Sequence, residues 1–363
     1  NLNRISLQGL NLVYNDLRVS LNIEGLVKDG MLKSRIRGSN IDFDGDMSIF
    51  FRLFQLGDFI IKPEIIADLK VGLNQNEKGT FFKKSTMKVE NWDFVLTGFV
   101  AADNYIDLTV TADNIDISRI PYLLPSKYSK TLSSYHPEGT LKFSWITKGK
   151  STSSQDPHYD ITFSLRDALI DNRRSNLSVK NLSFNGAYTN GAGNCSETST
   201  FKITDFNSRL GSSDYNGSFS LVNFKDPFTE LRFRGRLLPS ELIEFMNLSE
   251  TAEAGGSIDL DLKFSGRPGK KGDYRFTDVF NLAADSKASF NSVSLRLKNR
   301  QLDIRNATGI FLLNGSTVTD KFRLSLNGQD ITFSGKFTNF PGWLAGNPVI
   351  LGGTASVSAS SFR

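Results

Sequence analysis

The sequence has very few of the residues from which most active sites and metal sites are built. Its 363 residues include one cysteine, Cys195, and two histidines, His136 and His158. A single cysteine excludes an internal disulfide and a cysteine-built metal site. The two histidines stand beside prolines and do not form the His-x-x-x-His pair of zinc hydrolases. We therefore expect no catalytic residue, no metal site and no cofactor, and we predict that the protein is not an enzyme.

Two other features have ordinary structural interpretations. Residues 42–46, Asp-Phe-Asp-Gly-Asp, are similar to the start of a calcium loop but lack its downstream Glu. We interpret them as part of a hairpin with polar residues facing water. Cys195 could act as a nucleophile only if a histidine base lay close to it in space, and a hydrolase of that kind is the remaining catalytic alternative.

The chain also lacks a long hydrophobic run. Its most apolar stretch, residues 47–61, is interrupted by Arg52, Gln55 and Asp58, whereas a membrane-spanning helix needs about 20 apolar residues. The first residues have neither an initiator Met nor the basic and apolar segments of a signal peptide. We expect a processed chain or a piece of a longer protein, with any membrane anchor outside it.

The sequence has no large cluster of charged residues of one sign. The 43 Lys and Arg against 38 Asp and Glu give a net charge of +5, but both signs are spread along the chain. A nucleic-acid-binding protein usually gathers its cations in one patch. The densest cluster here is Arg232, Arg234 and Arg236. We interpret it as the solvated face of a strand, with contact to an anionic headgroup as the alternative, and predict no nucleic-acid partner.

Aromatic residues with a polar group are scarce, whereas phenylalanine is abundant. There are 29 Phe against 9 Tyr and 3 Trp. Phe buries a large ring without a polar group, while Tyr and Trp keep one. Sugar-binding surfaces tend to need that group and hydrocarbon-binding surfaces do not. The composition is therefore compatible with an ordinary Phe-rich core and with a surface for acyl chains.

Apolar and polar residues alternate strictly through most of the chain. In residues 106–112 and 258–264, for example, every second residue is apolar and its neighbours are Asp, Thr or Lys. A period of two is typical of antiparallel strands with one buried and one solvated face. Turn sequences such as those at 314–315 and 327–328, both Asn-Gly, separate these segments. We predict an all-β fold, an elongated and curled antiparallel sheet that forms a β-groove or an open sandwich.

Only a few short helices are expected. Residues 239–246 begin with a proline in the first turn and place Leu242, Phe245 and Met246 on one stripe. A similar but shorter segment lies at 118–124 and contains a proline. Such pieces are typical of plugs or caps on a sheet.

An internal repeat runs through the chain. Strand-like segments with a central glycine occur at Gly98, Gly217 and Gly335, which are 119 and 118 residues apart. A strand that begins with glycine follows twice, at 139–143 and 256–260. Self-similarity at a fixed period indicates repeats that stack on one another and share a core. We divide the chain into an N-terminal β region at 1–80, repeats at 81–200 and 201–318, and the start of a third, truncated repeat at 319–363.

Three features together resemble the AsmA-like proteins of Gram-negative envelopes: the strand at 93–99, the alternating strand that leads into residues 116–125, and the strand at 139–143. The resemblance covers residues 80–363. It implies an inner-membrane anchor, absent from this chain, followed by a large periplasmic β region. Larger relatives resemble the repeating β-groove lipid-transfer proteins, whose curled sheet has an apolar trough. The family has no catalytic motif to carry over.

These observations predict a periplasmic protein that binds or conducts lipid acyl chains in an apolar β-groove and contributes to lipid transport and outer-membrane biogenesis. Its partner would be phospholipid or another acyl-chain lipid. The alternative is a structural or glycan-binding β scaffold with a closed, Phe-rich core. The residues expected to line the groove share one parity on the repeated strands: Phe94, Leu96, Leu141, Phe143, Ile258, Leu260, Leu262, Phe264 and Phe333.

Overall fold

The computed structural model describes residues 4–17, 20–56, 59–61, 64–123, 134–248, 251–267, 282, 285–297, 303–339 and 350–359. The chain divides into two compact units. Unit 1 comprises Asn1–Arg166 and Ala187–Cys195, and unit 2 comprises Asp167–Gly186 and Ser196–Arg363. Both consist almost wholly of strands, so the all-β prediction is confirmed. The four-part division by repeats stays a prediction.

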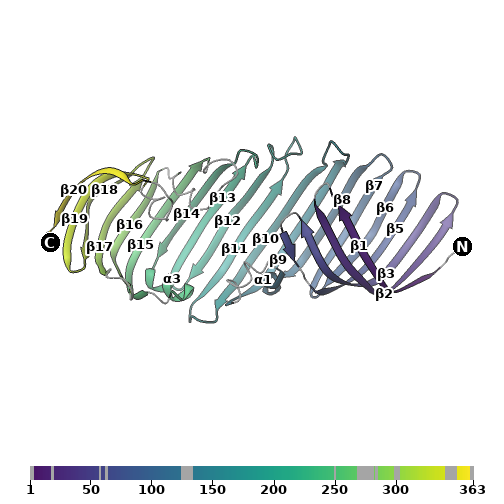
Figure 1. The fold of residues 1–363 in the computed structure, drawn as a ribbon, viewed down its shortest axis with the longest axis horizontal. Helices are drawn as coiled ribbons and strands as arrows, with labels where there is room; N and C mark the ends of the chain where they lie inside the picture. The colour runs from purple at the N-terminus through teal and green to yellow at the C-terminus, as the bar shows by residue number, and fades with distance from the viewer. Residues whose placement is uncertain are drawn as a thin grey trace. The chain divides into compact units, whose positions relative to one another are not determined.

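Unit 1 is a sheet in which each long strand pairs with its neighbours in the chain (Figure 1). All pairs are antiparallel, in the order β1–β2–β3–β5–β6–β7–β8–β9, and the short β4 pairs with β3. The strands are β1 (Ile5–Asp16), β2 (Leu21–Arg37), β3 (Asn40–Leu56), β4 (Phe59–Ile61), β5 (Ile65–Asn76), β6 (Gly79–Val89), β7 (Trp92–Ala101), β8 (Tyr105–Asp116) and β9 (Tyr135–Lys150).

Unit 2 has the same plan. Its strands pair antiparallel in chain order from β12 to β20. Two further strands, β10 (His158–Asn172) and β11 (Ser178–Thr189), contribute residues to both units. The remaining strands are β12 (Thr200–Leu210), β13 (Ser213–Val222), β14 (Phe228–Leu237), β15 (Thr251–Gly266), β16 (Ser286–Leu297), β17 (Asp303–Leu313), β18 (Thr317–Leu326), β19 (Gln329–Thr338) and β20 (Gly352–Ala359).

Bulges curl both sheets. An extra residue on one strand bends that strand and increases the local twist. The strand before each repeated glycine strand has such a register shift. The shifts lie between Phe82 and Ser85 in β6, Ile203 and Phe206 in β12, and Thr319 and Phe322 in β18.

The repeated glycines share one structural role. A Cβ atom placed on any of the three would collide with a backbone carbonyl oxygen of the next strand, so only glycine allows the two strands to approach this closely. The repeat in the sequence therefore corresponds to a repeated close contact between strands. The distances to the carbonyl oxygen would be 1.9 Å from Gly98 to Asp107, 2.5 Å from Gly217 to Arg232 and 2.7 Å from Gly335 to Thr354.

The helices are short, as predicted. η1 (Ile117–Arg119) and α1 (Ile120–Leu123) follow β8, and α3 (Pro239–Met246) connects β14 to β15. Met246 was expected on the apolar stripe of α3 but is 47% exposed, because the helix ends there and Asn247 turns the chain with a φ of 53°. Within the described ranges, no helix has the length and apolarity needed to cross a membrane.

Candidate functional site

In unit 1, the apolar residues of β7, β8 and β9 lie on one face of the sheet. The register places Leu96 of β7 opposite Val110 of β8, and Val110 opposite Trp145 of β9. Phe143 lies two residues before Trp145 and therefore on the same face. This face, which we call the apolar face of unit 1, carries all four residues predicted for this part of the chain: Phe94, Leu96, Leu141 and Phe143.

The apolar face of unit 1 is only partly sealed. The four predicted side chains are half-buried, whereas the small Ala112 between them is buried. Trp145 is 40% exposed, and its ring lies 6.3 Å from that of Tyr159 at a tilted angle. Large apolar side chains that remain partly in contact with water are typical of surfaces that bind another molecule.

The opposite face of unit 1 carries ion pairs and an unexpected row of rings. Asp107 and Lys148 face each other with 3.2 Å between Oδ2 and Nζ, and this hydrogen bond raises the pKa of Lys148. Phe99 stacks on Phe81 at 5.5 Å and on Tyr105 at 6.2 Å. The sequence analysis did not identify this row, because its members come from three different strands and become neighbours only through the strand register.

The acidic segment at 42–46 lies in β3, close to a lysine. Nζ of Lys83 is 3.4 Å from Asp42 Oδ1 and 4.0 Å from Asp44 Oδ1. A hydrogen bond from Asn74, together with Lys83, lowers the pKa of Asp42. The segment follows the turn between β2 and β3, which agrees with its interpretation as part of a hairpin. Lys83 lies near two of its three carboxylates, those of Asp42 and Asp44.

In unit 2, the corresponding apolar face runs over β14 and β15. Leu237 lies opposite Ile258 and Phe233 opposite Leu262. Leu260 lies between them on the same face and opposite a glycine, Gly235. The predicted residues Ile258, Leu260 and Leu262 are all half-buried, as in unit 1. We call this the apolar face of unit 2.

Phe264, at the end of the same strand, differs from its neighbours. It is 3% exposed, because Leu231, Leu262, Leu282 and Leu313 pack around it. Among the nine predicted residues, it alone has a buried side chain.

At β16 to β19 the apolar face of unit 2 closes into a cluster of phenylalanines. Phe311 and Phe322 are 7% and 4% exposed, and their ring centres are 4.7 Å apart. Phe290 and Phe333 lie 5.3 and 5.2 Å from Phe322. The predicted residue Phe333 therefore packs against this cluster. Val357, opposite Phe333 on β20, is 51% exposed.

The sequence analysis missed the part of this face on β12 to β14. Phe201 packs against Phe219 at 6.2 Å, and Tyr215 stacks on Phe233 at 5.7 Å. A signal was present in residues 231–237, where apolar residues alternate with three arginines.

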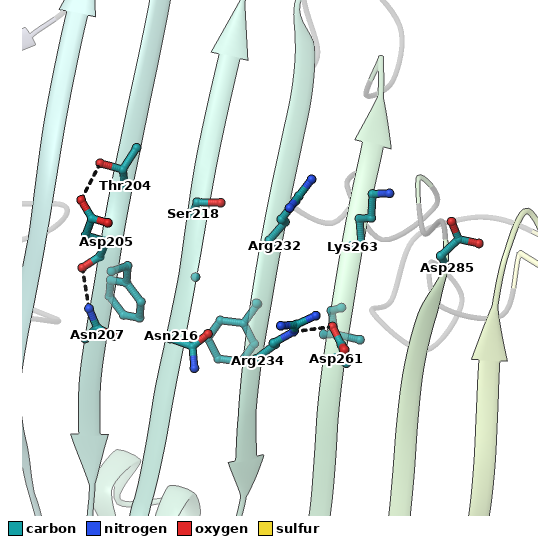
Figure 2. A pocket seen from close by; sticks show the side chains of 14 residues that line it. Thr204, Asp205, Asn207, Asn216, Ser218, Arg232, Arg234, Asp261, Lys263 and Asp285 are labelled. Atoms are coloured by element: carbon teal, nitrogen blue, oxygen red, sulfur yellow. Dashed lines mark hydrogen bonds and ion pairs between the residues drawn. The ribbon is translucent and has the colours of Figure 1, made fainter.

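The other face of unit 2 has a hollow of about 700 Å³, lined mainly by polar side chains of β12 to β15 (Figure 2). Arg234 and Asp261 form an ion pair at its edge, with 2.9 Å between Nε and Oδ1. The hydrogen bond that Arg234 donates to Asp261 raises the pKa of Arg234. The other labelled cations of the hollow, Arg232 and Lys263, lie beside this pair in Figure 2.

In unit 1, His158 is held between oxygen atoms. Its Nε2 is 2.9 Å from Asp160 Oδ2, and its Nδ1 is 3.2 Å from both the Gly191 carbonyl oxygen and Asn194 Oδ1. Partial burial lowers the pKa of His158, but the hydrogen bonds with Asn194 and Asp160 outweigh this effect and place the pKa above 6.5. The protonated ring donates from both nitrogens, so this site favours the charged form.

The part of the chain that the structure describes does not bring three His, Cys, Asp or Glu side chains together in a way that could hold a metal ion. No protein-family model matches the chain, and no curated protein and no solved structure is similar to it.

Proposed function

We propose that this protein binds or conducts the acyl chains of lipids on the apolar faces of its two units. One observation carries the proposal. In each unit, large apolar side chains lie in register across neighbouring strands, and most of them remain half-buried. Hydrocarbon would cover these faces without needing polar partners, which the faces do not offer.

Burial of methylene groups would supply the free energy of such binding. Transfer of one methylene from water to an apolar surface contributes about 0.8 kcal/mol. An acyl chain that buries on the order of ten methylenes would gain roughly 8 kcal/mol, before the cost of association is subtracted. Because association itself costs at least several kcal/mol, net binding requires that most of the acyl chain is covered.

The wider role is part of the same proposal. The resemblance to AsmA-like proteins supports a place in the periplasm, with an inner-membrane anchor supplied outside this chain. There the protein would act without catalysis, in lipid transport and outer-membrane biogenesis.

Joint replacement of Cys195, His136 and His158 by Ser or Ala should leave that activity intact. Loss of activity in a folded triple variant would contradict the non-enzymatic role.

A photo-crosslinking experiment tests lipid contact directly. A photoreactive amino acid is placed at Phe143 or Leu260 on the apolar faces. The matched control carries it at Lys142, the residue next to Phe143, which points to the opposite face and is exposed. We expect lipid adducts, detected by mass spectrometry, at Phe143 and Leu260 only. Adducts to protein alone at these two positions would contradict the proposal.

Charge substitutions provide the second test. Phe143→Glu and Leu260→Asp should abolish lipid crosslinking from a neighbouring position on the same face. Because both native side chains are half-buried, the new carboxylate keeps contact with water and costs less than a fully buried charge. We therefore expect the strand signal in circular dichroism to persist. Unfolding of both variants, with Lys142→Glu still folded, would show that these residues are closed core.

A structural or glycan-binding scaffold is the second candidate. The observation in its favour is the sealed cluster around Phe311 and Phe322, which shows that part of the apolar face of unit 2 needs no ligand. This candidate predicts that protein purified from an envelope extract carries no lipid. Bound phospholipid in stoichiometric amount would exclude it.

A further inference from the structure

The three arginines of β14 differ in their partners on β15. Arg236 lies opposite Asp259 and Arg234 opposite Asp261, and each pair forms an ion pair, at 2.7 and 2.9 Å. The hydrogen bond with Arg236 lowers the pKa of Asp259. These two rows of the ladder follow the usual rule that opposite charges face each other across neighbouring strands.

The third row breaks that rule. Arg232 lies directly opposite Lys263, so two cations face each other on the same side of the sheet. Among the described residues, neither has a carboxylate oxygen within 4.0 Å. Like charges in this position destabilise a sheet. Within the described ranges, these two cations therefore have no anionic partner that offsets their repulsion.

The surroundings of this pair suit an anion. Both cations line the hollow on the polar face of unit 2, where Ser218 lies opposite Arg232 on β13 (Figure 2). The hollow also contains three carboxylates: Asp261, which is paired with Arg234, and Asp205 and Asp285 at its sides. Asp205 accepts hydrogen bonds from Asn185 and Thr204, and Asp285 accepts one from Asn314.

We propose that Arg232, Lys263 and Ser218 form a binding site for a phosphate group with at least two free oxygens. The planar guanidinium of Arg232 can donate two parallel hydrogen bonds to such a group. The Lys263 ammonium adds a second positive charge, and the Ser218 hydroxyl a further donor. The site does not rest on the proposed acyl-chain binding, because its residues alternate with those of the apolar face and lie on the other side of the sheet.

Titration calorimetry of the full chain with pyrophosphate and with inorganic phosphate, at constant ionic strength, tests the site. Loss of one charge-assisted hydrogen bond should weaken binding by about tenfold or more, so Arg232→Gln and Lys263→Gln should each have this effect. Arg236→Gln is the matched control, because it removes the same charge from a paired position on the same strand. No binding by the native chain, or an equal loss in the control, would overturn the proposal.

A second variant separates binding from folding. Arg232→Glu replaces two facing cations by an ion pair, so its thermal midpoint should rise while pyrophosphate binding is lost. A lower midpoint would show that Arg232 has a structural role and would overturn the proposal.

Flotation with vesicles of equimolar phosphatidylcholine and phosphatidic acid identifies the source of the phosphate. Flotation that Arg232→Gln abolishes supports a lipid headgroup, and pyrophosphate binding without flotation supports a soluble phosphate compound.

Discussion

The apolar faces of β7 to β9 and of β16 to β19 both gather large apolar side chains on one side of a sheet, but they differ in burial. In the first region Phe94, Leu96 and Phe143 are half-buried. In the second, Phe311 and Phe322 are almost completely buried. The difference shows that alternation decides which side chains share a face, whereas the size and spacing of those side chains decide whether the face is sealed.

A glycine contributes to sealing the second region. Gly309 of β17 has a φ of 148°, and a Cβ atom there would lie 2.6 Å from the Phe322 ring. The ring therefore occupies space that any other residue would fill. In the first region, Trp145 of β9 stays 40% exposed, and the rings that stack on one another, Phe81 and Phe99, lie on the opposite face.

The largest loss of stability is expected for a substitution in the phenylalanine cluster around Phe311 and Phe322. Phe322→Ala removes a buried ring and leaves a cavity, which should lower the free energy of unfolding of unit 2 by about 3–5 kcal/mol. Leu96→Ala in unit 1 removes a half-buried side chain and should cost about 1–2 kcal/mol. Hydrogen exchange of peptides from each unit in increasing urea measures both values. Equal losses would contradict the distinction between the two regions.

A smaller loss of stability is expected when Gly309 is replaced. Gly309→Ala strains the backbone at a φ that residues with a side chain rarely adopt, which costs about 1–3 kcal/mol, and it also displaces the Phe322 ring. Gly255→Ala is the control, because a Cβ atom there meets nothing within 4 Å. We expect faster hydrogen exchange in β17 and β18 for the first variant alone. Similar exchange in both variants would show that Gly309 does not close the cluster.

The smallest expected effect is a dependence of local stability on pH. It should distinguish the two units, because both histidines of the chain belong to unit 1. The pKa of His158 is raised in the folded protein, so its contribution to stability is complete below pH 6.5 and is lost as pH rises through the folded pKa. Above that pH the segment 190–195 should become easier for a protease to cleave. His158→Gln should remove this pH dependence, whereas His136→Gln should retain it.

The sequence predicted the fold class and several elements because their determinants are local. Period-two alternation identified the strands, and the proline and apolar stripe identified the helix at 239–246. The three repeated glycines were found from spacing alone, and each lies against a carbonyl oxygen of the next strand. None of these inferences required knowledge of which strands pair.

The burial of individual site residues could not be predicted in the same way. Phe264 is buried partly by Leu282 and Leu313, which come from later parts of the chain. Phe322 joins its cluster through a bulge that follows Thr319, and one extra residue reverses which side chains face the same side. The unpaired cations Arg232 and Lys263 became evident only from the register of β14 and β15.

The pairing of each strand with its neighbour in the chain also has a consequence for how the protein folds. Within a unit, the strands that contact each other are mainly consecutive in the chain, so a strand can be added to a growing sheet without closing a long loop. Stability is then mainly a sum of interactions between adjacent strands. We expect strands to detach from one end of a unit while the rest stays intact, so that unfolding in denaturant proceeds in several steps rather than in one cooperative transition.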